Sequence, residues 1–292
     1  MILVTGATGQ FGSKAIEHLL NKEVNPSEIS ALVRDASKAK SLIEKGIQIK
    51  EGDYTNYNSM VKAFQGIDKL LLVSSNNRDA IENRTAHHKN AIKAAKEVGV
   101  KHIVYTSFVR KPGFEDSAIA DFQNSHLETE RYLKESGIDY TILQNGIYAE
   151  MILAFIGDKV ADTKTILFPA GEGNASWVLR EELAEAAAKV MISKGHKNKT
   201  YTLTNTESVG FKSIAENLSA ALGEKIEYKS PNVEEYRAIL EKAGIPEMYI
   251  GMFDMWSTAL KQQTMDEEDD SLTTFLNRKP TSVRQFIRNI YS

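Results

Sequence analysis

The sequence predicts an α/β fold, a doubly wound parallel sheet with a smaller, mostly helical C-terminal domain. Through the first half of the chain, short apolar runs alternate with helical patterns at a period of about thirty residues, as in successive β-α-β units. After residue 146 this alternation stops and helical patterns dominate. The 292 residues, 42% hydrophobic and 26% charged, suffice for one large or two modest domains.

The first β-α-β unit illustrates the pattern. Residues 1–5 form an apolar run and are predicted to be a strand. Residues 13–22 place apolar side chains at the spacing of one buried helix face, and residues 29–34 are predicted to be the second strand. The same criteria predict further strands at 47–50, 69–74, 102–107 and 140–144, and helices at 85–98 and 125–135.

The later part of the chain is expected to return to the first domain. Residues 168–174 are predicted to be a loop, residues 180–192 an Ala-rich helix and residues 201–204 a strand. We therefore expect the chain to pass between two domains more than once. The expected first domain comprises residues 1–146 with a return of 175–204, and the smaller second domain comprises residues 147–174 and 205–292.

Composition excludes several classes of protein. The 36 basic and 39 acidic residues give a net charge of −3, which disfavours nucleic-acid binding and attraction to an anionic membrane surface. With no cysteine there is no disulfide, thiolate nucleophile or Cys-based zinc site. The apolar start ends after four residues, and no window reaches the ~20 apolar residues of a membrane span. We expect a cytoplasmic protein.

A glycine-rich loop follows the first predicted strand and opens the first predicted helix. Its spacing is G-x-x-G-x-x-G, where glycine allows a tight turn and lets the backbone approach a pyrophosphate at the helix N-terminus. This context predicts a Rossmann domain that binds a dinucleotide. The residues expected to contact the cofactor here are Gly6, Ala7, Thr8, Gly9, Gln10, Phe11 and Gly12.

The end of the second predicted strand selects between cofactors, because a carboxylate there binds a ribose 2′-hydroxyl and an arginine accommodates a 2′-phosphate. Arg34 comes first, and Lys38 stands one turn further on. Arginine can hold a phosphate through two parallel hydrogen bonds, which favours NADPH. The alternative is NADH, with Asp35 on the ribose and Arg34 solvated.

Six further segments accompany the loop: residues 52–54 (GDY), 70–75 (LLLVSS), 99–107 (GVKHIVYTS), 126–130 (HLETE), 140–148 (YTILQNGIY) and 198–201 (NKTY). With them the chain resembles the NmrA-like group of atypical short-chain dehydrogenases/reductases, and within it bacterial members that reduce quinones and triphenylmethane dyes. The likeness runs nearly from end to end.

The resemblance implies NADPH bound by the first domain and a substrate held over the nicotinamide, in a cleft between the domains. It implies cofactor contacts from Asp53, near the adenine, and from Ser74, Ser75, Ser107 and Asn145 as well as from the glycine loop and Arg34. It also implies substrate contacts from Asn145 and Tyr148. Gln144 departs from the pattern, which has arginine at this position, so the contact of that side chain differs.

The expected catalytic positions depart from those of typical short-chain dehydrogenases. Those enzymes carry Tyr-x-x-x-Lys as a proton-transfer pair, whereas this chain has His126 and Glu130 at the matching spacing. An alkoxide needs a positioned proton donor, so loss of the pair argues against ketone reduction and sugar epimerisation. His126 is a candidate proton donor or a structural histidine bonded to Glu130 or backbone. Tyr148 is a candidate substrate contact or an aromatic packed at a domain junction.

The sequence favours an NADPH-dependent oxidoreductase that passes hydride to a quinone-like or cationic aromatic acceptor, a small molecule such as a quinone or planar aromatic. The first alternative is a non-catalytic NADP(H)-sensing regulator, which the absent Tyr-Lys pair fits equally well. The second is a nucleotide-sugar epimerase, which only fold analogy supports.

Two other clusters are not expected to bind a ligand. His87 and His88 point about 100° apart on a helix, so they cannot chelate one metal ion, and we expect a solvated pair. The acidic run 266–270 is expected to be a solvated loop before a helix. No metal site is predicted.

Overall fold

The computed structural model describes residues 1–75 and 80–292 and divides the chain into two units. The first comprises residues 1–108, 124–145 and 180–202 and is built on a seven-stranded sheet in the order β3-β2-β1-β4-β5-β6-β9. Each strand from β3 to β6 in this order pairs in parallel with its neighbour. The strands are β1 (Ile2–Val4), β2 (Ile29–Val33), β3 (Gln48–Glu51), β4 (Lys69–Leu72), β5 (His102–Phe108), β6 (Asp139–Asn145) and β9 (Lys199–Leu203).

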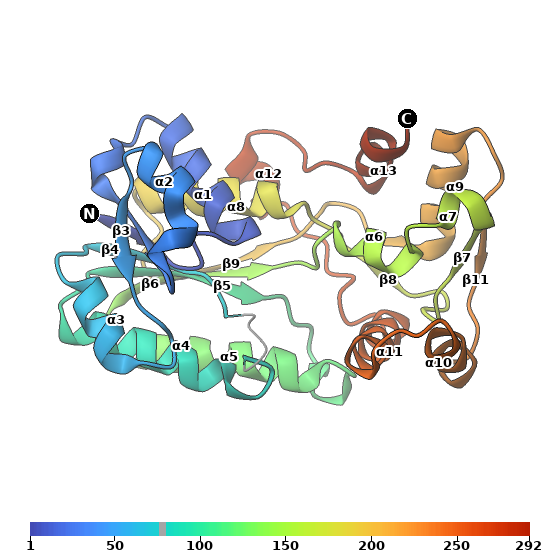
Figure 1. Cartoon of the computed structure of the whole chain (residues 1–292), viewed down its shortest axis with the longest axis horizontal. Helices are drawn as coiled ribbons and strands as arrows, with labels where there is room; N and C mark the ends of the chain where they lie inside the picture. The colour runs from blue at the N-terminus through green and yellow to red at the C-terminus, as the bar shows by residue number, and fades with distance from the viewer. Residues whose placement is uncertain (76–79) are drawn as a thin grey trace. The chain divides into compact units, whose positions relative to one another are not determined.

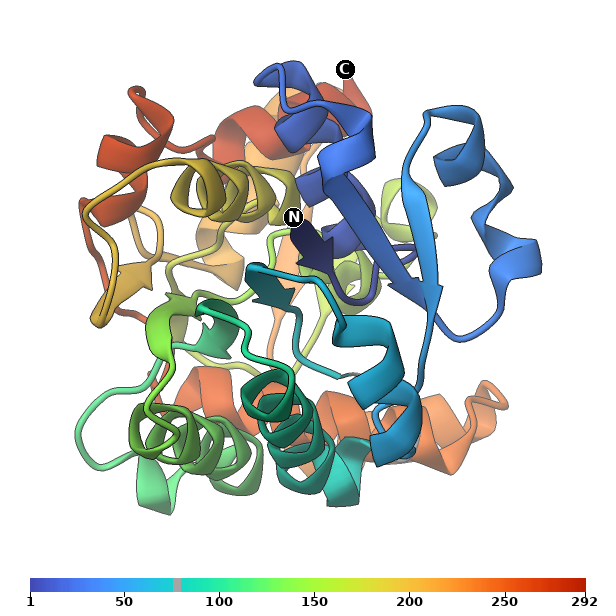
Figure 2. The ribbon, with the colours of Figure 1, turned by 90° about the vertical axis from the view of Figure 1, so that its left-hand side faces the viewer.

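Helices cover both faces of this sheet (Figure 1, Figure 2). One face carries α1 (Gln10–Asn21) and α8 (Arg180–Ile192), which pack against each other. The opposite face carries α3 (Tyr57–Phe64), α4 (Ala80–Glu97) and α5 (Ala120–Glu135). The unit also contains α2 (Lys40–Glu44) and the short 3₁₀ turns Pro26–Glu28 and Ala36–Ala39. The fold is therefore the predicted doubly wound one, and the strand order reverses between β1 and β4.

The core of the first unit lies between the sheet and α3, α4 and α5. The central strands β2 and β5 are buried along their whole length, as strands covered by helices on both faces should be. Phe64, Ile92 and Ile103 are fully buried together in this layer.

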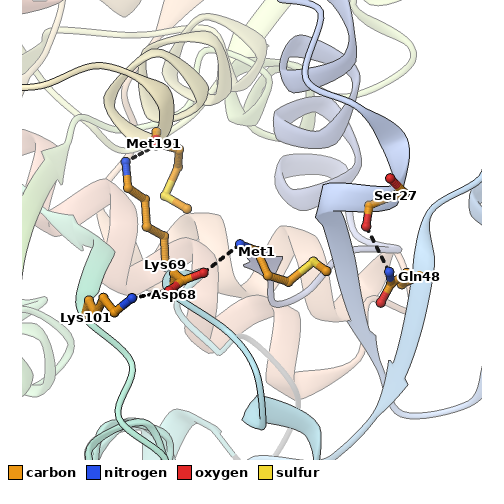
Figure 3. A network of polar contacts seen from close by, with 7 residues as sticks. All are labelled: Met1, Ser27, Gln48, Asp68, Lys69, Lys101 and Met191. Atoms are coloured by element: carbon orange, nitrogen blue, oxygen red, sulfur yellow. Dashed lines mark hydrogen bonds and ion pairs between the residues drawn. The ribbon is translucent and has the colours of Figure 1, made fainter.

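At the amino ends of the strands, charged side chains pair with one another (Figure 3). The Asp68 carboxylate accepts from the Met1 amine at 2.8 Å and from Lys101 at 2.6 Å. Lys69, the first residue of β4, donates to the Met191 carbonyl at the end of α8, at 2.7 Å. The Asp68 bonds lower the pKa of its carboxyl group to about 2, that from Lys101 contributing most.

The second unit comprises residues 109–123, 146–179 and 203–292. Two small sheets pair β8 with β10 and β7 with β11, and Phe155, Phe168, Trp177 and Phe211 form an aromatic core. Its helices and strands are the 3₁₀ turn Phe114–Asp116, α6 (Met151–Ile156), α7 (Val160–Thr163), β7 (Thr165–Leu167), β8 (Asn174–Ala175), β10 (Val209–Gly210), α9 (Phe211–Leu222), β11 (Glu227–Lys229), α10 (Val233–Lys242), α11 (Glu247–Lys261), α12 (Ser271–Leu276) and α13 (Val283–Tyr291).

The boundaries of the units differ from the expected ones in two places. Residues 109–123 belong to the second unit, although the apolar pattern assigned them to the first, and the returning segment is 180–202 rather than 175–204. Within the acidic run 266–270, Asp266 is partly buried and pairs with Lys111 in the second unit. Over the residues described, no helix is long and apolar enough to cross a membrane.

Candidate functional site

The glycine loop turns tightly from β1 into α1. Gly6 adopts φ +57°, a conformation that favours glycine, and its carbonyl accepts from the Gly9 amide at 2.9 Å. A Cβ on Gly12 would lie 2.3 Å from the Gly6 carbonyl oxygen, so only glycine allows the first turn of α1 to approach the loop this closely. The spacing of the three glycines is thus a requirement of the backbone path.

The N-terminus of α1 can accept an anion. Gly9 is the N-cap, and within the described chain neither a side-chain cap nor an acidic residue occupies the first turn. The first amides of a helix have no intrahelical partner and carry the positive end of its dipole, so they suit a phosphate. Ala7 and Phe11 are buried and anchor the loop, whereas Thr8 and Gln10 are exposed.

Arg34 is exposed directly after β2, whereas Asp35 serves its own backbone. The Asp35 carboxylate accepts from the Ser37 hydroxyl at 2.6 Å and from the Ser37 amide at 3.0 Å, which lowers its pKa and caps the following turn. Burial works to raise the pKa of Asp53, but hydrogen bonds from Thr55 and the charge of Arg34 outweigh it and hold the pKa below its usual value. The charge of Arg34 therefore acts on the Asp53 carboxylate.

At the carboxyl end of β4, side chains from β5 and α4 hold the backbone. The Ser74 amide donates to Thr106 Oγ1 at 2.9 Å, and the Ser75 amide donates to His88 Nε2 at 2.9 Å. The Ser75 carbonyl accepts from Arg84 Nε at 3.0 Å. The two predicted serines are therefore fixed by a polar clamp whose members Arg84 and His88 the sequence did not indicate.

The expectation of a solvated histidine pair is wrong. His87 is 3% exposed and His88 is fully buried, because α4 packs on the sheet and also against the neighbouring helices α3 and α5, so more than one of its faces is covered. Burial, and after it the nearby charge of Arg84, lower the pKa of His88 to about 3. His88 is therefore neutral at ordinary pH. Its Nε2 accepts a hydrogen bond from the Ser75 amide.

His126 belongs to a chain of hydrogen bonds that starts at His88. Because His88 Nε2 accepts from Ser75, its hydrogen is on Nδ1, which lies 3.0 Å from Thr129 Oγ1 and 3.3 Å from the Tyr105 hydroxyl. The Tyr105 hydroxyl also lies 2.7 Å from His126 Nδ1. His126 is 2% exposed, and the Tyr105 hydroxyl was not foreseen as its partner.

Glu130, the other member of the predicted pair, binds the ends of β5 and β6. Its carboxylate is 2% exposed and accepts from the Ser107 hydroxyl at 2.5 Å and from Gln144 Nε2 at 3.3 Å. Ser107 and Gln144 face each other in the strand register. Since Ser107 donates its single hydrogen to Glu130, it can only accept a hydrogen bond from any further partner.

Asn145, the last residue of β6, has an unsatisfied amide. It is 2% exposed, and neither Nδ2 nor Oδ1 has a hydrogen-bond partner within residues 1–75 and 80–292. Buried amides are normally bonded, so this side chain departs from the usual situation. Tyr148 is half-buried in the second unit, where its backbone bridges to Val178.

One contact to the loop comes from a residue that the sequence did not point to. The Arg180 guanidinium, at the start of α8, donates to the Gln10 side chain. The signal available was the predicted helix at 180–192, but its packing partner α1 is far away in sequence. Among the residues that the structure describes, no group of three or more metal-ligating side chains occurs.

Comparison with known proteins yields consistent matches. The sequence profile of the NmrA-like family matches residues 1–287. Quinone oxidoreductase 2 of Escherichia coli is 32% identical over 100% of this chain and 99% of its own length, and the NADPH complex of the quinone oxidoreductase from this organism superposes with a TM-score of 0.91 over 100% of both chains. The NAD(P)H azoreductase of Xenophilus azovorans is 30% identical, covering 85% of this chain and 82% of that one.

A further solved structure is similar over nearly the whole chain. The triphenylmethane reductase of Citrobacter sp., complexed with NADP(H), is 34% identical with a TM-score of 0.91, covering 99% of both chains.

Proposed function

Because this chain belongs to the NmrA-like family, we propose that it is an NADPH-dependent oxidoreductase that transfers hydride to a quinone-like or cationic aromatic acceptor. Its relatives include reductases named for quinones, azo compounds and triphenylmethane dyes. These acceptors share a conjugated system that spreads the incoming electrons. The proposed substrate is therefore a small conjugated molecule.

The observation that carries the proposal is the backbone cradle between Gly6 and Gly12. It opens α1 beside the point where the strand order reverses, which is where open α/β sheets bind dinucleotides. The close approach of Gly12 to the Gly6 carbonyl keeps side chains out of this turn. A pyrophosphate can therefore reach the free amides of the helix.

Arg34 supports NADPH rather than NADH. Asp35, the rival for a ribose hydroxyl, is engaged with Ser37, whereas the Arg34 guanidinium is exposed at the end of β2. A guanidinium there matches a 2′-phosphate in charge and geometry. We assign the remaining cofactor contacts to Asp53, Ser74, Ser75, Ser107 and Asn145.

Bound NADPH supplies the hydride, and the chain binds and orients the reactants. Ser107 donates its hydrogen to Glu130, and His88 is neutral, so neither group is an acid that could protonate an alkoxide. A quinone avoids this need, because its hydroquinone anion, with a phenol-like pKa of about 10, takes its proton from water. A triarylmethyl cation becomes neutral on accepting hydride. We assign Tyr148 to the acceptor as a substrate contact and keep His126 as the candidate proton donor.

The test is NADPH consumption by the purified protein against benzoquinones, naphthoquinones, azo compounds and cationic triarylmethane dyes, with NADH in parallel. Saturable turnover that favours NADPH supports the proposal and ranks the acceptors. Cofactor binding without turnover across the panel contradicts it and identifies a non-catalytic sensor of NADP(H). Affinity for a sugar nucleotide with bound NAD would identify an epimerase.

A further inference from the structure

β1 and β4 lie side by side where the strand order reverses, and the chain leaves both strands there. β1 ends at Val4 and continues through Thr5 into the glycine loop. β4 ends at Leu72 and continues through Val73 into the two serines proposed to contact the cofactor. A dinucleotide bound at this reversal lies between the two segments, so their separation determines whether both can contact it.

Side chains hold the chain just beyond β4. The Val73 amide donates to Thr5 Oγ1 at 2.8 Å, and the amides of the two serines that follow donate to side chains of β5 and α4. Val73 also packs against the glycine loop, because a Cβ built on Gly6 would lie 3.6 Å from the Cβ and Cγ1 atoms of Val73. Through Thr5 and Val73, the glycine loop and the end of β4 are therefore in contact.

The Tyr54 hydroxyl joins these two residues. Tyr54 comes from a third part of the first unit, the chain that follows β3. Its hydroxyl oxygen lies 2.6 Å from Thr5 Oγ1 and 2.7 Å from the Val73 carbonyl oxygen. Both distances are those of good hydrogen bonds between oxygen atoms. One hydroxyl group thus links the residue before the glycine loop to the residue before the two serines.

Helix α4 holds Tyr54 in place. The Tyr54 ring stacks on His87, with ring centroids 6.4 Å apart and ring planes 11° apart, and it meets the ring of His88 edge-on. The Tyr54 carbonyl accepts from Asn90 Nδ2 at 3.0 Å. These contacts involve the ring and the backbone. Replacing Tyr54 by Phe therefore keeps them and removes only the link that the hydroxyl makes.

We propose that Tyr54 is a positioning residue, whose hydroxyl sets the separation between the glycine loop and the carboxyl end of β4, an inference that rests on the proposed NADPH site. Tyr54 acts through Thr5 and Val73 and not by contact with the cofactor. The neighbouring Asp53 carboxylate is held separately, because it accepts from the Thr55 amide and hydroxyl at 2.8 and 2.7 Å. The adenine half of the cofactor therefore does not depend on the Tyr54 hydroxyl.

The test compares NADPH with 2′-AMP, which carries the adenine and the 2′-phosphate but neither the pyrophosphate nor the nicotinamide half. Calorimetry measures both affinities in the wild type and in Tyr54→Phe. The affinity for NADPH should fall by on the order of tenfold, since NADPH must contact both segments at once, whereas the affinity for 2′-AMP should stay that of the wild type. A residue that only stabilises the fold would change the unfolding temperature and neither affinity.

Two substitutions of Thr5 test the same link from its other side. Thr5→Ser keeps an oxygen at this position and should bind NADPH as the wild type does. Thr5→Val keeps the shape but removes the oxygen, and should bind NADPH about tenfold more weakly. Because Tyr54 acts through Thr5, the double variant Tyr54→Phe/Thr5→Val should bind NADPH no more weakly than Thr5→Val alone.

Tyr57→Phe is the matched control, because the Tyr57 hydroxyl bonds to Glu97, the last residue of α4, and should leave both affinities unchanged. An unchanged NADPH affinity in Tyr54→Phe overturns the inference, and so do equal losses for NADPH and 2′-AMP or the same loss in Tyr57→Phe. If Tyr54→Phe does not fold, equal NADPH affinities of Thr5→Ser and Thr5→Val overturn it. A wild type that does not bind NADPH refutes the proposed function itself.

Discussion

The two ends of the sheet in the first unit treat their polar groups in opposite ways. At the amino ends, Asp68 is paired with Lys101, and Lys69 is bonded to the end of α8. At the carboxyl ends, Arg34 is exposed and Asn145 has no partner in the described chain. The amino ends therefore gain stability from polar contacts that already exist, whereas in the proposed function the polar groups at the carboxyl ends bind the cofactor. Substitutions at the amino ends should therefore change stability, and substitutions at the carboxyl ends should change cofactor binding.

The largest difference between the effect on cofactor binding and the effect on stability is expected for Arg34→Ala. Losing charge-assisted bonds to the 2′-phosphate should weaken NADPH binding by about 10- to 100-fold, leave NADH binding nearly unchanged, and change unfolding free energy by less than about 0.5 kcal/mol. Calorimetric titration with both cofactors and thermal unfolding of the free protein measure these effects. Lys38→Ala is the control on the same surface. Equal losses for NADPH and NADH would remove Arg34 from the 2′-phosphate site.

His88→Leu should affect both stability and cofactor binding, because some polar groups at the carboxyl ends of the strands also hold the fold together. The substitution leaves the buried Ser75 amide unsatisfied and should lower the free energy of unfolding by about 1–3 kcal/mol. It should also weaken NADPH binding, because Ser75 is a proposed cofactor contact. Urea unfolding and calorimetry separate the two effects. A variant of full stability would show that the Ser75 clamp does not depend on His88.

Asp68→Asn should have the smallest effect, and on stability alone. Asp68 is 48% exposed, so solvent screens its ion pairs and the loss at neutral pH is at most about 1 kcal/mol. Its folded pKa of about 2 lies below the unfolded value of 3.8, so the contribution is present above pH 3.8 and disappears as the pH falls through about 2. Unfolding of both proteins between pH 2 and 7 should give converging curves at the acid end. A change in NADPH affinity would break the division between the two ends.

Features that depend only on residues adjacent in the sequence could be predicted from local sequence patterns. The glycine loop follows from the spacing of Gly6, Gly9 and Gly12, because strand, turn and helix are contiguous there. His88 was misjudged because the angle between adjacent helical side chains says nothing about which helices and strands cover them. The Tyr105 to His126 bond joins elements that only the folded sheet brings together. Resemblance pointed to Asn145, but the lack of hydrogen-bond partners for its amide within the described chain is visible only in the folded structure.

The path of the chain between the units constrains how the protein is made. It passes from one unit to the other after residues 108, 123, 145, 179 and 202. The helix that packs on α1, and whose Arg180 contacts the loop through Gln10, is therefore synthesised long after the loop itself. A nascent chain released at residue 146 would expose the face of α1 that α8 covers. The cofactor site is thus completed late in translation, and the contacts that complete it have high contact order.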